Sequence, residues 1–414
     1  MSETAAAIGN SPAEIFGALL APAGKADPYP LYAALHELGE AAKVMPGLVV
    51  ANSYDAINAM LRDPMFLVAD AARLDQISAG WREHKSLEAD SLLNLNGADH
   101  ARIRSVVAGA FTPRRVSKLT AAVEQIADEL ISAMAERGSA GSPVDFMAEF
   151  AYQLPVTVIC ELLGVPEPDR AAFRPVARDL VVALEPFEDL AELAGADTAA
   201  IWLTEYFTGL VAARRAEPRD DLVSALAATG EVAGQAQPAL SEAELLSNLI
   251  LLLVAGFETT TNLLGNGLRI ILTSPDVESS LRAGQVSTEA FVAEVLRYDA
   301  PVQATARWRP DPGQVGGVPV PPGGQVVALL GAANRDSRRF SSPESFDPAR
   351  PDSGPLSFGA GAHFCVGAAL ARMEATVAFP RLLASFPRLA AAGEPVRRTG
   401  LVLRGFDQQP VTVC

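Results

Sequence analysis

The chain has 414 residues, of which 49% are hydrophobic, and it carries a formal net charge of −16. A chain of this length can bury a large core, while its negative charge argues against a nucleic acid or an anionic membrane surface as a partner. Residues 1–25 lack a basic stretch followed by an apolar core, so we expect no signal peptide and a cytoplasmic location. Cys160, Cys365 and Cys414 are too few and too scattered for a disulfide framework.

Amphipathic helical patterns dominate the chain, and strand-like segments are short. We find no internal repeat and no interdomain linker, so the sequence predicts a mainly α fold with a small β part, built as a single domain over residues 1–414. In chain order, the predicted elements are a strand region at 41–52, helices at 117–138, 197–218 and 287–301, and strand regions at 325–336 and 397–413.

The longest predicted helix begins at Ser241 and runs to Thr273. Ser241 and Glu244 have the spacing of a capping box. At 1.5 Å per residue this helix is on the order of 50 Å long, enough to cross a whole domain. Its most apolar run, 249–257, is too short to span a bilayer, so we expect no membrane anchor.

The middle of this helix, AGFETTTN at 255–262, is poorly suited to a helix. Gly256 lowers helix stability, and β-branched residues such as Thr259 lose rotamer freedom. Glu258 places a carboxylate in an apolar helix, where an acid beside a hydroxyl can pass protons to a bound group. Such local inconsistency is typical of functional sites. The alternative, a kinked core helix with a solvated Glu258, stays open on this segment alone.

Cys365 stands in the glycine-rich stretch FGAGAHFCVGAALAR, just before a predicted helix. Four interpretations are open: a buried structural thiol, a nucleophile with His363 as base, a zinc or iron–sulfur ligand, or the axial thiolate of a haem. No C-x-x-C motif supports the third. The fourth needs a close backbone approach and a thiolate stabilised by amide groups and by the following helix N-terminus, which this stretch supplies.

Four motifs occurring in series resemble those of the cytochrome P450 family. The pattern F-x-x-G-x-x-x-C-x-G is met by Phe358, Gly361, Cys365 and Gly367. A-G-x-E-T-T is met by residues 255–260, and E-x-x-R by Glu294 and Arg297. Arg350, in the stretch FDPARP, lies where the family has the arginine that completes a Glu–Arg–Arg triad with that pair. The resemblance covers nearly the whole chain and is to the soluble bacterial type. It implies the P450 fold, with a long central helix over a haem and a loop that carries the cysteine ligand.

The resemblance also implies roles for individual residues. Cys365 would ligate the iron of haem b, Glu258 and Thr259 would be catalytic, and Glu294, Arg297 and Arg350 would form a structural triad. His100 with Arg104, and Arg307 with His363, would hold the two haem propionates. The implied cofactor-binding residues are His100, Arg104, Ala255, Gly256, Arg307, Phe358, Gly359, His363, Cys365 and Gly367. His36 and His84 match no family position, and we expect them to be ordinary surface or core residues.

The activity implied by the resemblance is that of a haem-thiolate monooxygenase that hydroxylates or epoxidises a medium-sized organic substrate of secondary metabolism. Electrons would come from a ferredoxin and ferredoxin reductase, and we expect a monomer. Substrate specificity would lie in segments 71–96 and 168–200, which carry none of the motifs. For the acidic residues in 180–195, acids on an outer helix face are favoured over a site for a cationic substrate.

Because the protein is acidic overall, docking of an acidic ferredoxin requires a local basic patch. The residues proposed for this patch are Arg102, Arg114, Arg115, Arg338, Arg339 and Arg372. Three other functions remain open. They are oxidative coupling or desaturation on the same fold, a non-catalytic haem-binding protein, and a haem-free hydrolase that uses Cys365 and His363.

Overall fold

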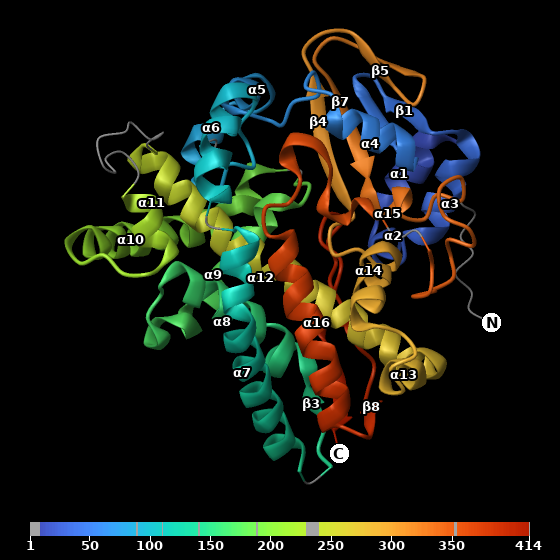
Figure 1. Cartoon of the computed structure of the whole chain (residues 1–414). Coiled ribbons are helices and arrows are strands. Elements are labelled where there is room, and N and C mark those ends of the chain that lie inside the picture. The colour runs from blue at the N-terminus through green and yellow to red at the C-terminus, as the bar shows by residue number, and fades with distance from the viewer. Residues whose placement is uncertain are drawn as a thin grey trace. The chain divides into compact units, whose positions relative to one another are not determined.

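The structure is a computed structural model that describes residues 9–87, 90–109, 111–139, 141–187, 189–228, 240–351 and 354–413. The described chain is mostly helical with small sheets (Figure 1). It divides into two compact units. Unit 1 contains Met1–Val68, Gly265–Cys365 and Pro395–Gln408, and unit 2 contains Ala69–Leu264, Val366–Glu394 and Gln409–Cys414.

Unit 1 is built around a four-stranded sheet with the order β1-β2-β7-β4. Strand β2 pairs with β7 in parallel, and the other two pairings are antiparallel. Its strands are β1 (Ala41–Met45), β2 (Leu48–Ala51), β4 (Ala304–Arg309) and β7 (Gly324–Leu329), with the hairpin β5 (Gly313–Val315) and β6 (Val318–Val320) and the pair β9 (Val396–Arg397) and β10 (Phe406–Gln408). Its helices are α1 (Pro12–Leu20), α2 (Pro22–Ala26), α3 (Tyr29–Leu38), α4 (Tyr54–Arg62), α13 (Pro275–Arg282), α14 (Thr288–Tyr298) and α15 (Leu330–Ala333).

The two faces of the sheet in unit 1 pack against different helices. Val49 and Val326 belong to a core cluster that includes Ile57 of α4. Val50, the next residue along β2, belongs to a second cluster that includes Leu35 of α3. Since successive side chains of a strand point to opposite faces, α4 covers one face and α1 and α3 cover the other.

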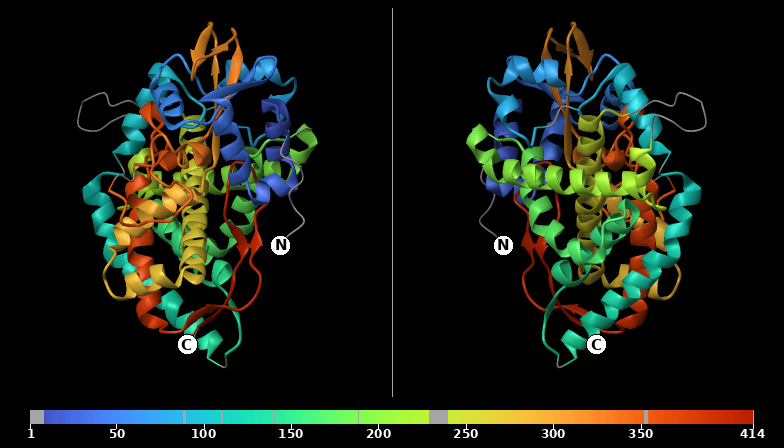
Figure 2. Two further views of the ribbon diagram at one scale, coloured as in Figure 1. Left: turned by 90° about the vertical axis from the view of Figure 1, so that its right-hand side faces the viewer. Right: turned by 90° about the vertical axis from the view of Figure 1, so that its left-hand side faces the viewer.

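Unit 2 is mainly helical. Helix α16 runs alongside α7, as the red and teal helices show in Figures 1 and 2. Arg381 of α16 bridges Glu124 and Asp128 of α7 at 3.4 and 3.1 Å. The helices of unit 2 are α5 (Ala71–Ile77), α6 (Gly97–Ala108), α7 (Pro113–Gly138), α8 (Gln153–Leu163), α9 (Phe173–Leu180), α10 (Ala194–Ala216), α11 (Leu222–Ala227) and α16 (Ala368–Ser385). The sheet of unit 2 has the order β3 (Val144–Asp145), β11 (Pro410–Val413) and β8 (Leu389–Ala391).

Helix α12 (Glu242–Thr273) begins in unit 2 and ends in unit 1, and it confirms the predicted long helix. The predicted capping box is present, because the Glu244 N–H donates to Ser241 Oγ at 3.2 Å and the Ser241 N–H donates to Glu244 Oε2 at 2.8 Å. By length and composition alone α12 could cross a membrane, but 61% of its most apolar window is buried. Burial of this extent is usual for a core helix.

The other predicted elements differ from the structure mainly at their ends. The predicted helices at 117–138, 197–218 and 287–301 are observed as α7, α10 and α14. The predicted strand at 325–336 is wrong beyond Leu329, where pairing with β4 ends and the short helix α15 begins. The predicted strand region at 397–413 consists of β9, β10 and β11, which belong to two different sheets.

Candidate functional site

The loop before Cys365 is closed by its own backbone hydrogen bonds. The Cys365 N–H donates to the Phe358 carbonyl at 2.9 Å, and the Phe364 N–H donates to the Gly361 carbonyl at 3.2 Å. The rings of Phe358 and Phe364 flank the loop with centroids 6.4 Å apart. Cys365 itself is exposed, so the loop presents this side chain outward from a fixed frame. The interpretation of Cys365 as a buried structural thiol is therefore wrong.

Two glycines of this loop adopt backbone angles that favour glycine. Gly359 has φ +69 and Gly361 has φ +67, in the left-handed region. A Cβ added to Gly361 would lie 2.2 Å from the carbonyl oxygen of Leu61 in α4. Gly367 meets nothing within 4 Å and precedes the first residue of α16. The first two glycines therefore allow the loop to turn and to pass close to α4, while Gly367 leaves open space after Cys365.

One face of α12 is open near the middle of the helix. Ala255 is exposed and Thr259 is partly exposed, although most of their neighbours are buried. The two residues are at i and i+4, so they share a face. The Thr259 hydroxyl donates to the Ala255 carbonyl at 3.0 Å, which is the predicted bond to the preceding turn. A Cβ on Gly256 would lie 2.9 Å from Ile159 Cδ1 of α8, so the missing side chain lets α8 approach.

Glu258 is buried in this helix, with an exposed fraction of 1%. The alternative of a solvated glutamate is therefore wrong. Adjacent residues of an α-helix point about 100° apart, so Glu258 and Thr259 do not share a face. Proton transfer between their side chains requires a bridging water or a change of rotamer.

His100 and Arg104 lie one turn apart on α6, and the His100 side chain is buried. Arg102 on the same helix donates to Glu244 Oε1 of α12 at 2.5 Å. Just before α6, the Leu92 N–H donates to Asn248 Oδ1 of α12 at 3.0 Å. Since positions 244, 248, 255 and 259 follow one stripe of the helix, α6 and residues 90–92 are attached along the face that carries Ala255 and Thr259.

Arg307 in β4 is a buried cation whose described contacts are neutral. Its guanidinium donates to Thr305 Oγ1 at 3.0 Å and to the Ala306 carbonyl at 2.8 Å. In the part of the chain that the structure describes, no charged partner offsets its burial, which lowers its pKa to about 10. A buried guanidinium is stabilised by an anion. Arg307 therefore fits the carboxylate of a haem propionate.

Glu294, Arg297 and Arg350 are brought together in unit 1. Arg297 donates to both oxygens of Glu294 at 2.8 and 2.6 Å, and Arg350 Nε lies 3.5 Å from Glu294 Oε1. The remaining donors of Arg297 bind backbone carbonyls of residues 334, 343 and 345. Glu294 and Arg297 are both fully buried. The bonds from Arg297 to the three carbonyls and from Arg350 to Glu294 tie α14 to residues 334–350, the segment before the cysteine loop.

The described residues contain no cluster of three potential metal ligands among His, Cys, Asp and Glu. The donor set around Cys365 thus has the chemistry of a single thiolate, as in an axial haem ligand, rather than that of a zinc or iron–sulfur centre. His363 lies in the same loop, partly exposed, two residues before Cys365.

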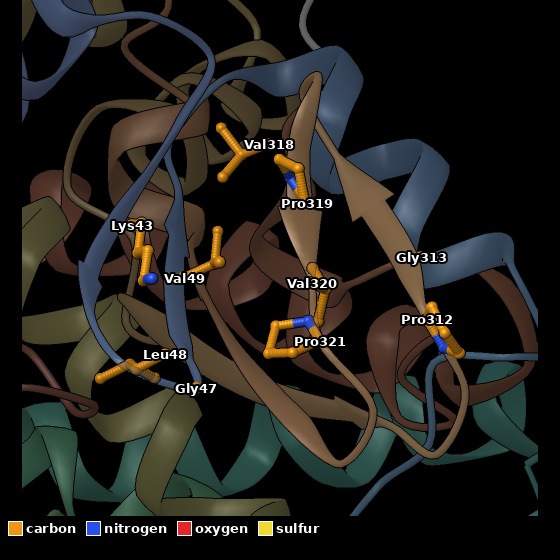
Figure 3. Close-up of a pocket in the computed structure, with 10 residues that line it drawn as sticks. All are labelled: Lys43, Gly47, Leu48, Val49, Pro312, Gly313, Val318, Pro319, Val320 and Pro321. Atoms are coloured by element: carbon orange, nitrogen blue, oxygen red, sulfur yellow. The ribbon is translucent and has the colours of Figure 1, made fainter.

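A pocket of about 490 Å³ lies elsewhere in unit 1, between the β1–β2 hairpin and the β5–β6 hairpin. Figure 3 shows Lys43 and Val49 on one side and Val318 and Val320 on the other. Its lining is mainly apolar, and it contains none of the predicted site residues.

Sequence reasoning missed several buried or paired groups. His84, expected to be ordinary, contacts Asp197 Oδ2 through Nδ1 at 2.7 Å. Glu374 in α16 is buried, and its Oε2 has no hydrogen-bond partner in the described residues. Neither feature has a sequence signal, because the His84 contact joins distant segments and the environment of Glu374 depends on packing around α16.

Some of the arginines proposed to dock the electron donor already form ion pairs within the protein. Arg102 binds Glu244, and Arg338 binds Asp336 at 2.8 Å. Arg115 is exposed. The side chain of Arg114 lies outside the described residues.

Comparison with known proteins places the chain in a family. The cytochrome P450 family model matches residues 203–399. The cytochrome P450 monooxygenase PikC of Streptomyces venezuelae is 39% identical over 93% of this chain and 91% of its own length. The polyketide biosynthesis cytochrome P450 PksS of Bacillus subtilis is 36% identical over 87% of each chain.

A solved structure agrees with these relatives. P450BioI, in complex with an acyl carrier protein ligated to hexadec-9Z-enoic acid, matches with a TM-score of 0.87 and 31% identity. The match covers 95% of this chain and all of P450BioI. The family is one of haem-iron enzymes that oxidise small molecules with electrons from redox partners. From its sequence and its fold, the chain belongs to the cytochrome P450 family, among the bacterial monooxygenases.

Proposed function

We propose that this protein is a haem-thiolate monooxygenase in which Cys365 is the axial ligand of haem b. The observation that carries the proposal is the exposed Cys365 thiol, held outward by a loop that closes on the Phe358 carbonyl. A thiolate in this position favours cleavage of the O–O bond.

Four further residues are proposed to hold the haem through its propionates. Arg307 is a buried cation, and a propionate would supply the anion that its described contacts lack. His363 is proposed to bind the same propionate, and His100 and Arg104 of α6 are proposed to bind the other. Charge-assisted hydrogen bonds of this type are the strongest available to a carboxylate.

When bound, the haem supplies activation of O₂ and insertion of one oxygen atom into an organic substrate. In that chemistry, the protein's own residues bind the substrate and supply protons. Ala255, with its small side chain, keeps the open face of α12 accessible. The Thr259 hydroxyl is proposed to turn from the Ala255 carbonyl and hold a proton or a water on this face, and the buried Glu258 carboxyl is proposed to supply the proton.

The substrate is proposed to be a medium-sized natural-product intermediate that is hydroxylated or epoxidised. Support comes from similarity to PikC and to PksS, whose name refers to polyketide biosynthesis. Asp189 and Glu192 form a capping box with each other, which favours a structural task for these acids over recognition of a cationic substrate. Product analysis by mass spectrometry distinguishes oxygen insertion from oxidative coupling or desaturation, which leave no added oxygen atom.

The electron donor is proposed to be a ferredoxin with its reductase, and the protein is proposed to be a cytoplasmic monomer without a membrane anchor. Arg115 is the best residue for testing the docking patch, because Arg102 also holds α6 to α12. Arg115→Glu should slow reduction by ferredoxin and weaken its salt dependence. Lys43→Glu, an exposed charge reversal in β1, is the control. Equal reduction rates for both variants would exclude Arg115 from the docking surface.

The first experiment is the carbon monoxide difference spectrum of the reduced protein, compared between wild type and Cys365→Ser. We expect a strongly red-shifted Soret band in the wild type and its loss in the variant, because a hydroxyl is a poorer axial donor than a thiolate. Cys160→Ala, at a buried thiol in α8, should keep the band. A red-shifted band that survives in Cys365→Ser, or no haem in the wild type, would overturn the proposal.

A further inference from the structure

The pocket in unit 1 lies between two hairpins that present apolar side chains to each other. In the β1–β2 hairpin, Lys43 and Val49 are directly opposite each other, so their side chains share one face of the sheet. Figure 3 shows them across the pocket from Val318 and Val320 of the β5–β6 hairpin. Val49 and Val320 are buried members of one core cluster, against which Val318 also packs. The pocket therefore has an apolar interior that is continuous with the core of unit 1.

The backbone around the pocket is fixed without a ligand. The Gly47 carbonyl accepts the Gln325 N–H at 2.8 Å, and the Pro321 carbonyl accepts the Gly324 N–H at 2.9 Å. The lining also contains three prolines, whose rings restrict φ: Pro312, Pro319 and Pro321. A pocket whose walls are already ordered costs a ligand little conformational entropy on binding.

The described lining carries a single charged side chain, that of Lys43. Lys43 is exposed, and within the described residues no hydrogen bond or ion pair engages its ammonium group. A lysine combines an apolar stem with a charged end, which suits the mouth of an apolar pocket. In a protein with a net charge of −16, this cation is open to an external anion.

From this geometry we infer that the pocket binds a small molecule that joins an apolar body to one carboxylate. The carboxylate pairs with Lys43, and the apolar body lies between the two hairpins. The volume of about 490 Å³ is within the range of about 300–1,000 Å³ that is usual for ligand pockets. Because the lining contains none of the proposed haem-site residues, this inference goes beyond the proposed function and does not rest on it.

The test uses decanoate as the probe and the haem-loaded protein as the target. A photoreactive diazirine derivative of decanoate is crosslinked to the protein, and the labelled peptides are identified by mass spectrometry. We expect labels within residues 43–49 and 312–321, and unlabelled decanoate should suppress them. Mapping the labels separates this pocket from binding near the haem, which would label other peptides.

Three variants test the roles of charge and space. Lys43→Gln removes the cation, and Val318→Trp fills the pocket and should abolish labelling of residues 43–49 and 312–321. Lys118→Gln, which removes an exposed lysine on α7, is the matched control and should label as wild type does. Circular dichroism checks that each variant is folded.

The charge is tested by competition between decanoate and its uncharged analogue decanol. The advantage of decanoate over decanol as a competitor should be about fivefold larger in wild type than in Lys43→Gln, the size expected for one exposed charge pair. Taking this ratio within each protein cancels the different solubilities of the two competitors. Lys118→Gln should keep the wild-type ratio.

Labels confined to other peptides would overturn the inference, and so would labels in the pocket that decanoate does not suppress. An equal ratio in wild type and Lys43→Gln would also overturn it, because Lys43 would then serve only to keep the edge strand β1 from pairing with another sheet. A dimer in sedimentation that Val318→Trp dissociates would show that a second copy of the chain covers the pocket, which likewise contradicts the inference. Failure of the proposed function has a different signature, namely no red-shifted carbon monoxide band in wild type, and leaves this labelling unchanged.

Discussion

At the scale of single residues, two buried titratable groups respond to burial in different ways: Arg307 is a cation that an anion would stabilise, whereas Glu374 favours its neutral form. Arg307 is a buried cation that fits an anionic cofactor group. Glu374 is a buried acid with no ion-pair partner in the described residues. Burial raises the pKa of Glu374 well above its usual value, so this carboxyl keeps its proton where an exposed glutamate has lost it.

The neutral state of Glu374 predicts how stability depends on pH. Between the unfolded-state pKa, near 4.5, and the raised folded-state value, the folded protein holds a proton that the unfolded chain has released. Stability therefore falls as pH rises through this window, by up to about 1.4 kcal/mol per pH unit. Glu374→Gln should remove this slope and be increasingly more stable than wild type toward high pH.

The measurement is urea unfolding of wild type and Glu374→Gln at several pH values above 4.5. Glu136→Gln, an exposed change on α7, is the control and should follow the wild-type slope. Parallel wild-type and Glu374→Gln curves would mean that the Glu374 carboxyl ionises in the folded state without cost.

At the scale of elements, the cysteine loop depends on its glycines for its path rather than for flexibility. Gly361 combines a left-handed backbone with a close approach to the Leu61 carbonyl of α4. Both constraints exclude a side chain, and they act on the loop that presents Cys365. The contact between the loop and α4 therefore constrains the path of the loop that carries Cys365.

Gly361→Ala should destabilise the protein and reduce its haem content. The left-handed conformation alone costs an alanine about 1–2 kcal/mol, and the clash with Leu61 adds to this. Gly209→Ala is the control, since Gly209 is exposed in the interior of α10 with nothing within 4 Å, and alanine there should stabilise by up to about 1 kcal/mol. Thermal unfolding and the haem-to-protein absorbance ratio measure both effects. A Gly361→Ala protein as stable and as haem-rich as wild type would refute the tight approach to α4.

At the scale of the molecule, unit 1 is held together by a buried charge network between distant parts of the chain. Asp299, just after α14, accepts the Tyr29 hydroxyl at 2.5 Å and Arg404 Nε at 2.6 Å, and Arg397 lies 3.4 Å away. Burial alone would raise the pKa of Asp299, but Arg404 and Arg397 outweigh it and lower the pKa. The network thus ties α3, the end of α14 and the segment between β9 and β10 into one unit.

Removing the main cation of this network should cost much more than removing its neutral donor. Arg404→Ala leaves the buried carboxylate of Asp299 poorly compensated, and the loss of a partner in a buried pair costs about 3–5 kcal/mol. Tyr29→Phe removes one hydrogen bond and should cost about 1–3 kcal/mol. Chemical denaturation followed by circular dichroism gives both values. A smaller loss for Arg404→Ala than for Tyr29→Phe would show that Arg397 alone suffices for Asp299.

The candidate site was predictable where its parts are close in sequence. The cysteine loop and the A-G-x-E-T-T segment each lie in one continuous stretch, and the capping box at Ser241 placed the start of α12 correctly. The end of the strand predicted at 325–336 was not predictable, because it depends on where pairing with β4 stops. The burial of Glu258 was also not predictable, because it depends on what packs against α12.

By itself, the sequence determined the mainly α fold class, the long helix and the candidate haem ligand, because helix periodicity, caps and short motifs are local properties of the chain. Only the tertiary structure decided the strand order β1-β2-β7-β4, the burial that raises the pKa of Glu374 and the attachment of Ser86 to Asp197. These features depend on burial and on contacts between residues far apart in sequence, and both arise only when the chain has folded.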